Sequence, residues 1–276
     1  MSTEKRFAVL IDADNISYRY IKYILTELAR DGIATYKRIY GDWTRPEMNT
    51  WKQVLLESSI IPMQQYAYTN GKNSTDSALI IDAMDILYTG SVDGFCLVSS
   101  DSDFTRLAAR LREAGKEVIG MGEGKTPAPF RNACNKFRYL EVLEQAGQAT
   151  AEGEAPAAPA IHGSDKQLDT IREAVVSILN DNSDEEGKIS LSHVGTALAN
   201  RYPDFDVRNF GHNKLSRFMT SLGFRQVQTA GSRGIYIALP APKAAPKAEK
   251  AKKKPPSQGS KGGSKQGGKG GGGKKK

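Results

Sequence analysis

Four aspartates stand where an apolar stretch ends or where a helix is expected to begin. Asp12 ends the stretch "FAVLID", Asp101 and Asp103 lie in "SSDSDF" after the apolar "FCLV", and Asp76 lies near the start of "KNSTDSALIIDAMDILY". A carboxylate at the end of a buried strand is unfavourable unless it is paired or neutralised. The sequence therefore predicts that these side chains share a compensating partner.

A divalent cation is the partner that this set of residues favours. Carboxylates within a few ångströms raise one another's pKa unless a cation lies among them. Oxygen ligands without His or Cys favour Mg²⁺ or Mn²⁺ over Zn²⁺, and Mg²⁺ often takes phosphate oxygens as further ligands. The chemistry indicated is phosphoryl transfer to water, assisted by one or two ions.

The third acid, Asp76, is placed by helical periodicity. It falls on the same stripe as the apolar residues of its predicted helix, at the first turn, whereas Asp82 and Asp85 point away and are expected to be solvent-exposed. An acid in a first turn also complements the helix dipole, which explains its position but not its inward direction. Asn15, soon after Asp12, could orient a ligand water or hydrogen-bond Asp12, or it could cap the first helix.

Strand and helix patterns alternate through the first half of the chain. The expected strands are Phe7–Ile11, Ala34–Tyr40, Met63–Tyr68, Phe95–Ser99 and Val118–Met121, and the expected helices are Tyr18–Ala29, Glu47–Glu57, Thr75–Tyr88 and Asp103–Ala114. This order predicts an α/β fold, in which a parallel sheet carries helices on both faces. Ligands of such folds bind beyond the carboxyl ends of the strands, where Asp12 and Asp101 are expected.

The stretch from Phe7 to Leu140 resembles the NYN branch of the PIN-like ribonucleases. The resemblance rests on "DADN", "KNSTD" and "SSDSDF", which occur in the order of that family. It implies a PIN-like, metal-dependent nuclease fold in which Lys72, ahead of the helix acid, could contact a phosphate. The metal-binding acids that it implies are Asp12, Asp76, Asp101 and Asp103, with Asn15 beside them.

Composition divides the chain into four parts. We predict a nuclease-like domain at 1–144, an Ala/Pro-rich linker at 145–164, a second domain at 165–239 and a disordered Lys/Gly-rich tail at 240–276. The tail holds 12 Lys and one Glu from Ala241 onward, so the net charge of +8 leaves −3 for the preceding residues. Such a tail could bind a polyanion without sequence preference, or it could be a solvated solubility tail. Two cysteines without CxxC spacing give neither a disulfide framework nor a zinc site.

The second domain shows three helical patterns followed by the strand patterns "FRQVQ" and "GIYIAL". This order predicts a small α+β winged helix. The stretch "RYPDFDVRNFGHNKLSRFMTSLGF" is similar to the OST-HTH, or LOTUS, domain, which implies RNA binding and, in some relatives, binding of a partner protein instead. Each candidate phosphate contact, taken singly, fits better with an ordinary solvated basic residue. These candidates are Lys214, Arg217, Arg225 and Arg233.

Together with the two resemblances, these patterns predict a cytoplasmic ribonuclease that depends on Mg²⁺ or Mn²⁺ and is delivered to RNA by the winged helix and the tail. An endonuclease is favoured because nothing in the sequence would recognise a chain end. The nuclease domain could also form a homodimer. No apolar stretch approaches the length of a membrane helix, so no membrane partner is expected.

Two alternatives remain at this point. The first is a non-catalytic RNA-binding adaptor. The second is a phosphatase of the haloacid dehalogenase type, with Asp12 as nucleophile and Asp14 as acid, although Ile16 stands where that motif has Thr or Val.

Overall fold

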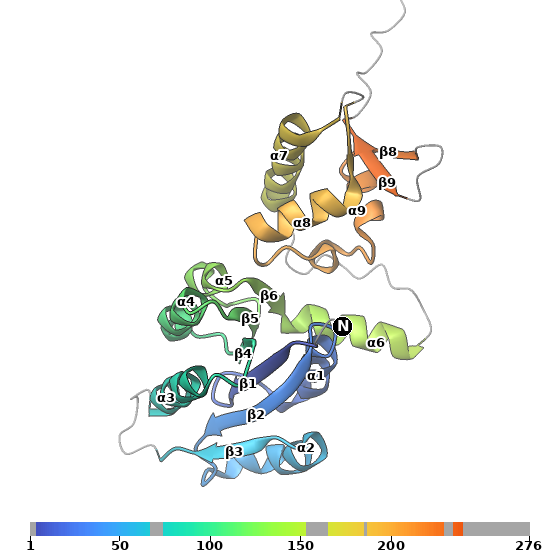
Figure 1. Cartoon of the computed structure of the whole chain (residues 1–276). Coiled ribbons are helices and arrows are strands. Elements are labelled where there is room, and N and C mark those ends of the chain that lie inside the picture. Colours follow the sequence, from blue (N-terminus) through green and yellow to red (C-terminus); the bar gives the residue numbers. More distant parts are fainter. Residues whose placement is uncertain (1–3, 67–73, 153–164, 185–186, 229–233, 240–276) are drawn as a thin grey trace, which may run out of the picture. The chain divides into compact units, whose positions relative to one another are not determined.

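The chain is described by a computed structural model that covers residues 4–66, 74–152, 165–184, 187–228 and 234–239 (Figure 1). All of these residues belong to one compact unit, 1–240. The predicted tail and most of the predicted linker lie outside the described residues.

The first domain contains a six-stranded sheet in the order β3-β2-β1-β4-β5-β6, and every neighbouring pair runs parallel. Its strands are β1 (Arg6–Asp12), β2 (Ile33–Gly41), β3 (Ile61–Gln64), β4 (Gly94–Val98), β5 (Glu117–Gly122) and β6 (Lys136–Tyr139). Its helices are α1 (Ile21–Leu28), α2 (Trp51–Ser58), α3 (Ser74–Thr89), α4 (Thr105–Glu113), α5 (Ala128–Ala133) and α6 (Leu140–Glu152), with the 3-10 turns η1 (Tyr18–Tyr20), η2 (Pro46–Thr50) and η3 (Ser102–Phe104). The predicted α/β class with a parallel sheet is confirmed.

Strand β1 is apolar throughout because both of its faces are buried. Phe7, Val9 and Ile11 pack with residues of α1, α2 and α6, whereas Ala8 and Leu10 pack with residues of α3, α4 and α5. Helices therefore cover both faces of the sheet, as Figure 1 shows. A central strand covered in this way reads as a continuous apolar run rather than an alternating one.

The acids of the predicted site lie at the switch point of this sheet. The chain builds outward from β1 through β2 to β3, returns to β4 beside β1, and then continues outward through β5 to β6. Connections therefore leave the carboxyl ends of β1 and β4 in opposite directions, and this is the place where α/β folds bind their ligands. Asp12 is the last residue of β1, and the segment with Asp101 directly follows β4.

The structure differs from the sequence prediction at one boundary and contains two short elements that were not predicted. The sequence predicts a linker from residue 145, but α6 continues to Glu152. The stretch "EQAGQATAE" contains no proline and is rich in Ala, Gln and Glu, which favour helix. The sequence also gives no sign of α5 and β6, which have six and four residues and are too short to show a period.

The expectation that Asp82 is a solvent-exposed helix charge is wrong. Its carboxylate accepts hydrogen bonds from Arg38 and Tyr40 of β2, and its side chain is 16% exposed. A helical stripe locates the apolar side of α3 but cannot show a polar partner on a neighbouring strand. These bonds fix α3, and with it Asp76, against the sheet.

The second domain combines three helices with a small antiparallel sheet in the order β7-β9-β8. Its elements are α7 (Asp165–Asn182), β7 (Lys188–Ser190), α8 (Leu191–Arg201), η4 (Val207–Phe210), α9 (Leu215–Ser221), β8 (Arg225–Gln228) and β9 (Ile235–Ala238). The three helices and the final pair of strands were predicted, and β7 was not. The core of this domain includes Val175, Leu198 and Phe218, all fully buried.

Two further expectations concern the whole chain. Cys96 and Cys134 are buried free thiols, as the absence of a disulfide pattern predicts. Among the helices of the described ranges, none has the length and apolar character needed to cross a bilayer.

Candidate metal centre

Three of the predicted acids meet at the carboxyl edge of the sheet. Asp76, Asp101 and Asp103 each offer a carboxylate oxygen, and these oxygens all lie within 4.8 Å of one another. Asp76 belongs to the first turn of α3, while Asp101 caps η3 by accepting a hydrogen bond of 2.9 Å from the backbone N–H of Asp103. This cap holds Asp101 and Asp103 on one short turn facing the head of α3.

The fourth acid, Asp12, is fully buried next to this cluster. Its Oδ2 accepts hydrogen bonds from Asn15 Nδ2 at 2.7 Å and from Ser99 Oγ at 2.8 Å, and its Oδ1 accepts one from Asp14 N–H at 3.1 Å. Burial raises the pKa of Asp12, and these three hydrogen bonds partly oppose the rise. Asp12 is not among the oxygens that meet within 4.8 Å, but its charge acts on Asp76.

Ser99 joins the two strand ends and was missed in the sequence. It is 1% exposed, its Oγ donates to Asp12, and the same Oγ accepts a hydrogen bond of 3.1 Å from Asp101 N–H. The available signal was a serine directly after a fully buried apolar strand, because a hydroxyl in such a place needs partners. Asn15 takes the first of its two predicted roles, since its amide bonds Asp12.

The electrostatics of the cluster are unfavourable without a ligand. Burial, followed by the charges of Asp12, Asp101 and Asp103, raises the pKa of Asp76 from 3.8 to about 6. Neither Asp76 nor Asp101 forms an ion pair within the part of the chain that the structure describes. Like charges held together in this way favour a bound cation.

A fifth acid, Asp14, lines the rim of the cluster. Its Oδ2 accepts a hydrogen bond of 2.9 Å from Thr75 Oγ, and its Oδ1 lies 3.3 Å from Arg45 Nη1. Arg45 is 51% exposed and follows β2, so it brings a cation to the same edge of the sheet. The sequence reasoning weighed Asp14 as a phosphatase acid and overlooked Arg45.

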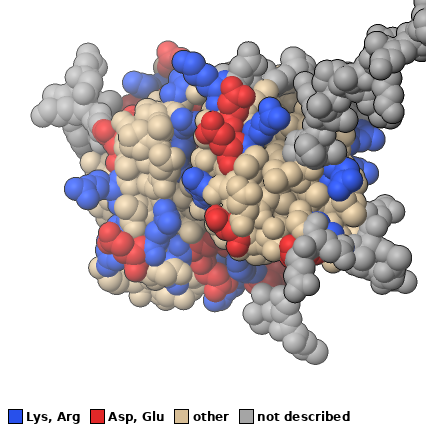
Figure 2. Space-filling view, turned by 90° about the horizontal axis from the view of Figure 1, so that it is seen from above, with Lys and Arg blue, Asp and Glu red and all other residues tan. Residues whose placement is uncertain are grey.

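The predicted RNA contacts fall into two groups. Lys72 and Arg233 lie outside the described residues, so the structure says nothing of them. Lys214, Arg217 and Arg225 are exposed, the first two at and within α9 and the third at the start of β8. On the face shown in Figure 2, blue and red side chains are interspersed and no broad basic surface is visible. Phosphate attraction by that face is therefore modest.

The donor set fits a hard divalent ion. The three clustered donor atoms are carboxylate oxygens, the kind of ligand that Mg²⁺ and Mn²⁺ prefer. Their placement beyond the carboxyl ends of parallel strands, at the switch point, is where α/β folds bind ligands. A parallel sheet with clustered acids at this edge has the architecture of a PIN-like nuclease domain.

Comparison with known families agrees with this class. A model of the NYN domain matches residues 6–141, and a model of the OST-HTH/LOTUS domain matches residues 166–237. The first domain is therefore an NYN domain, which belongs to the PIN-like nuclease superfamily, and an OST-HTH/LOTUS domain follows it in the chain.

Comparison with solved structures adds little to this assignment. A protein of unknown function from Vibrio parahaemolyticus is 19% identical with a TM-score of 0.42, and the match covers 50% of this chain and 94% of that one. Scyllo-inositol dehydrogenase from Lactobacillus casei is 14% identical with a TM-score of 0.27, and the match covers 55% of this chain and 42% of that one. A search of curated proteins found no match.

Proposed function

We propose that this protein is a metal-dependent ribonuclease that hydrolyses RNA phosphodiester bonds at the carboxyl edge of its parallel sheet. The observation that carries the proposal is the meeting of Asp76, Asp101 and Asp103 within 4.8 Å, beside the buried Asp12. The NYN match supports a nuclease, and the OST-HTH/LOTUS match supports an association with RNA.

Each residue of the site has a distinct task in this proposal. Asp76, Asp101 and Asp103 would hold Mg²⁺ or Mn²⁺, with Asp12 as a further acid. The bound ion would supply a Lewis acid for the phosphate and lower the pKa of an attacking water. Ser99 and Asn15 hold the Asp12 carboxylate through hydrogen bonds of 2.8 and 2.7 Å, and Ser99 also orients the turn that carries Asp101.

The second domain would bring RNA to this site. Its exposed basic residues, Lys214, Arg217 and Arg225, are the candidate phosphate contacts among the described residues. We propose endonucleolytic cleavage in the cytoplasm.

The test is cleavage of labelled single-stranded, hairpin and duplex RNAs by the intact protein with Mn²⁺, Mg²⁺ or EDTA. We expect cleavage with a divalent ion and none with EDTA. Asp101→Asn should lower the rate at least about 1,000-fold, because it removes a ligand that acts on the reacting phosphate. Asp85→Asn is the matched control, since Asp85 is an exposed aspartate of α3 outside the cluster, and it should cleave like the wild type.

Three other outcomes would contradict the proposal. Tight RNA binding without cleavage under any ion would make the protein an RNA-binding adaptor. A covalent aspartyl-phosphate, trapped with a small phosphate ester, would indicate a phosphatase of the haloacid dehalogenase type instead. Equal loss of activity in Asp101→Asn and Asp85→Asn would move the chemistry away from the acid cluster.

A further inference from the structure

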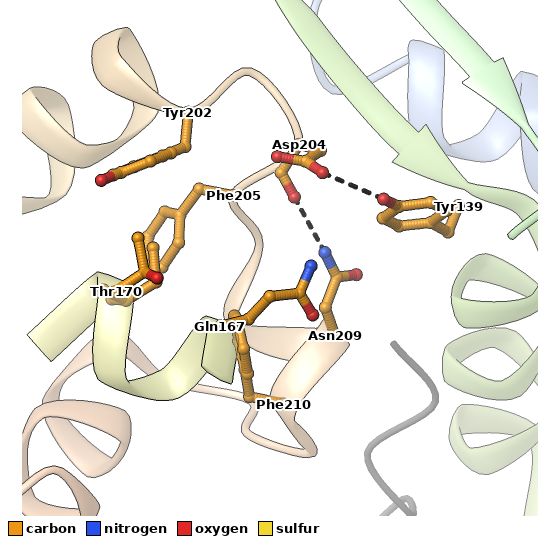
Figure 3. Close-up of a pocket in the computed structure, with 9 residues that line it drawn as sticks. Tyr139, Gln167, Thr170, Tyr202, Asp204, Phe205, Asn209 and Phe210 are labelled. Atoms are coloured by element: carbon orange, nitrogen blue, oxygen red, sulfur yellow. Dashed lines mark hydrogen bonds between the residues drawn. The ribbon is translucent and has the colours of Figure 1, made fainter. Parts of the chain in front are cut away.

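A small pocket is lined by residues of the second domain and by Tyr139 of the first, and none of the clustered acids lines it (Figure 3). The pocket has a volume of about 130 Å³. Helix α7 and the segment from the end of α8 through η4 form most of its wall, and Tyr139 of β6 completes it. The lining residues are Tyr139, Gln167, Thr170, Ile171, Tyr202, Asp204, Phe205, Asn209 and Phe210.

Aromatic side chains form much of this lining and are held in place from behind. Tyr202, Phe205 and Phe210 are partly buried. The rings of Phe205 and Phe210 pack against the fully buried Phe218, with centroids 6.0 and 4.9 Å apart. A rigid aromatic lining offers planar surfaces on which a flat ring can stack without a large loss of side-chain entropy.

One polar group in the lining is fixed and has a free acceptor. Asn209 is 5% exposed, and its Nδ2 donates a hydrogen bond of 2.8 Å to the backbone carbonyl of Asp204. That bond fixes the orientation of the amide, and Oδ1 has no hydrogen-bond partner in the described part of the chain. In Figure 3 the Gln167 side chain reaches from α7 toward this amide. An amide oxygen fixed in this way can accept a hydrogen bond from the polar edge of a base.

The charge of the lining argues against a phosphate. Asp204 is the charged residue of the lining, and its carboxylate accepts hydrogen bonds from Tyr139 OH at 2.9 Å and from Arg131 at 2.8 Å. No Lys, Arg or His is among the described residues that line the pocket. A neutral ligand is therefore favoured over an anion. A volume of about 130 Å³ is also well below that of ordinary drug-sized ligand pockets and suits a single ring system.

We propose that this pocket receives one unstacked nucleobase of a single-stranded RNA. The aromatic lining stacks on the base, and Asn209 Oδ1 accepts a hydrogen bond from an N–H group on its edge. This inference rests on the proposed function, because the base belongs to the RNA that the protein processes. The second domain would then contact a base of the RNA, in addition to the phosphate contacts already considered.

The first test fills the pocket without disturbing its core. Thr170 is exposed on α7 and lines the pocket, and its hydroxyl donates to the carbonyl of Lys166. Thr196 on α8 is a matched control because it is exposed, donates in the same way to the carbonyl of Ser192, and lies outside the pocket. Binding of short fluorescein-labelled single-stranded RNAs of mixed sequence is measured in EDTA by anisotropy.

Thr170→Phe should weaken binding about 10-fold, the loss expected for one stacked base, whereas Thr196→Phe should bind like the wild type. Gln167→Leu, a smaller change in the same lining, should weaken binding in the same direction. The proposal is overturned if all variants bind the RNA with the same affinity. It is also overturned if Thr170→Phe and Thr196→Phe weaken RNA binding equally. A pocket occupied by a partner protein would give the first of these results.

A second test locates the base. One abasic site is placed at each position of the RNA in turn. We expect that an abasic site at one position weakens binding by the wild-type protein about 10-fold, and that the other positions have little effect. That cost should disappear in Thr170→Phe, because the pocket is already filled. An abasic cost that is the same in both proteins places the base elsewhere and overturns the proposal.

The two proposals fail in distinguishable ways. If Thr170→Phe binds RNA as tightly as the wild type and the wild type cleaves RNA, the pocket assignment is wrong and the nuclease stands. If the pocket variant loses binding but no ion supports cleavage by the wild type, the nuclease is wrong and the base pocket stands.

Discussion

The partly buried acids at the two ends of the six-stranded sheet differ in whether they have ion-pair partners. At the amino end, Glu117 accepts a hydrogen bond from Lys5 at 2.7 Å and forms an ion pair with Lys136 at 3.0 Å. At the carboxyl end, Asp76 and Asp101 have no ion-pair partner in the described ranges and lie within 4.8 Å of each other. One edge of the sheet is electrostatically balanced, and the other is not.

The pKa values of the two edges show what this difference means. Burial alone would raise the pKa of Glu117, but the hydrogen bonds and charges of Lys5 and Lys136 outweigh burial and lower it. At the other edge burial acts together with the charges of neighbouring acids, and the pKa of Asp76 rises to about 6. The same sheet thus uses carboxylates for stability at one end and keeps them unbalanced at the other. An unbalanced cluster is the arrangement that a bound cation would stabilise.

The largest expected effect is stabilisation by a divalent ion at the carboxyl edge. At 100 times its Kd, Mg²⁺ or Mn²⁺ should raise the free energy of unfolding by about 2.7 kcal/mol. Both tryptophans, Trp43 and Trp51, belong to the first domain, so their fluorescence during urea unfolding reports on that domain. Asp101→Asn should abolish the gain and Glu117→Gln should keep it. The same gain in Asp101→Asn would place the ion outside the cluster.

At the balanced edge, Glu117→Gln should lower the free energy of unfolding by about 1.5 kcal/mol, because two charged hydrogen bonds are lost. Glu113→Gln, an exposed glutamate of α4, is the control and should change it by less than about 0.5 kcal/mol. Since the pKa of Glu117 is lowered in the native state, its contribution is complete above its ordinary value of 4.5 and is lost as pH falls. A difference between wild type and variant that grows on acidification would contradict this assignment.

At the unbalanced edge, Asp76→Asn should stabilise the metal-free protein. We expect a net gain of about 0.5–1 kcal/mol at neutral pH, since solvent screens a partly exposed group and the helix dipole loses a favourable charge. The pKa of Asp76 is raised from 3.8 to about 6, so the native state binds the proton more tightly than the unfolded chain. The destabilisation by its charge therefore develops as pH rises through this range.

Urea unfolding in EDTA at several pH values measures the gain of Asp76→Asn. The gain should be near zero at low pH and complete above about pH 6. Asp85→Asn, on the exposed side of the same helix, should show neither the gain nor the pH dependence. If the stability gain of Asp76→Asn is the same at every pH, it comes from helix propensity rather than from the loss of a charge.

The unbalanced edge was more accessible to sequence reasoning than the balanced one. Asp12 and Asp101 follow long apolar runs, and the position of a strand end in a parallel sheet then fixes the edge on which both must lie. Glu117 and Lys136 begin short strands without a sequence pattern that pairs them. Their contact depends on β5 and β6 being neighbours, and β6, with four residues, was not predicted.

The parts of the site that the sequence did not reveal are contacts between elements. Ser99 and Arg45 acquire their partners through the packing of β1 beside β4 and β2, which one-dimensional periodicity does not specify. Asp82 was misassigned for the same reason, since its partners lie on β2. Apart from the end of α6, the domain limits stay predictions, and so do the homodimer, the cytoplasmic location and the role of the tail, because no observation tests them.

The smallest expected effect concerns Arg45, whose side chain lies beside Asp14 at the rim of the acid cluster. Its distance of 3.3 Å to Asp14 resembles the lysine contacts of Glu117, but its side chain is 51% exposed. An exposed ion pair contributes little, so Arg45→Gln should change the free energy of unfolding by less than about 0.5 kcal/mol. If Arg45 instead contacts the phosphate of bound RNA, the same variant should reduce the steepness of log affinity against log salt concentration by about one.

Arg110→Gln, at an arginine of α4, is the control and should leave that slope unchanged. A large loss of stability without a change in slope would mean that Arg45 balances the acids as the lysines do at the other edge, and the two ends of the sheet would then differ less than their pKa values indicate.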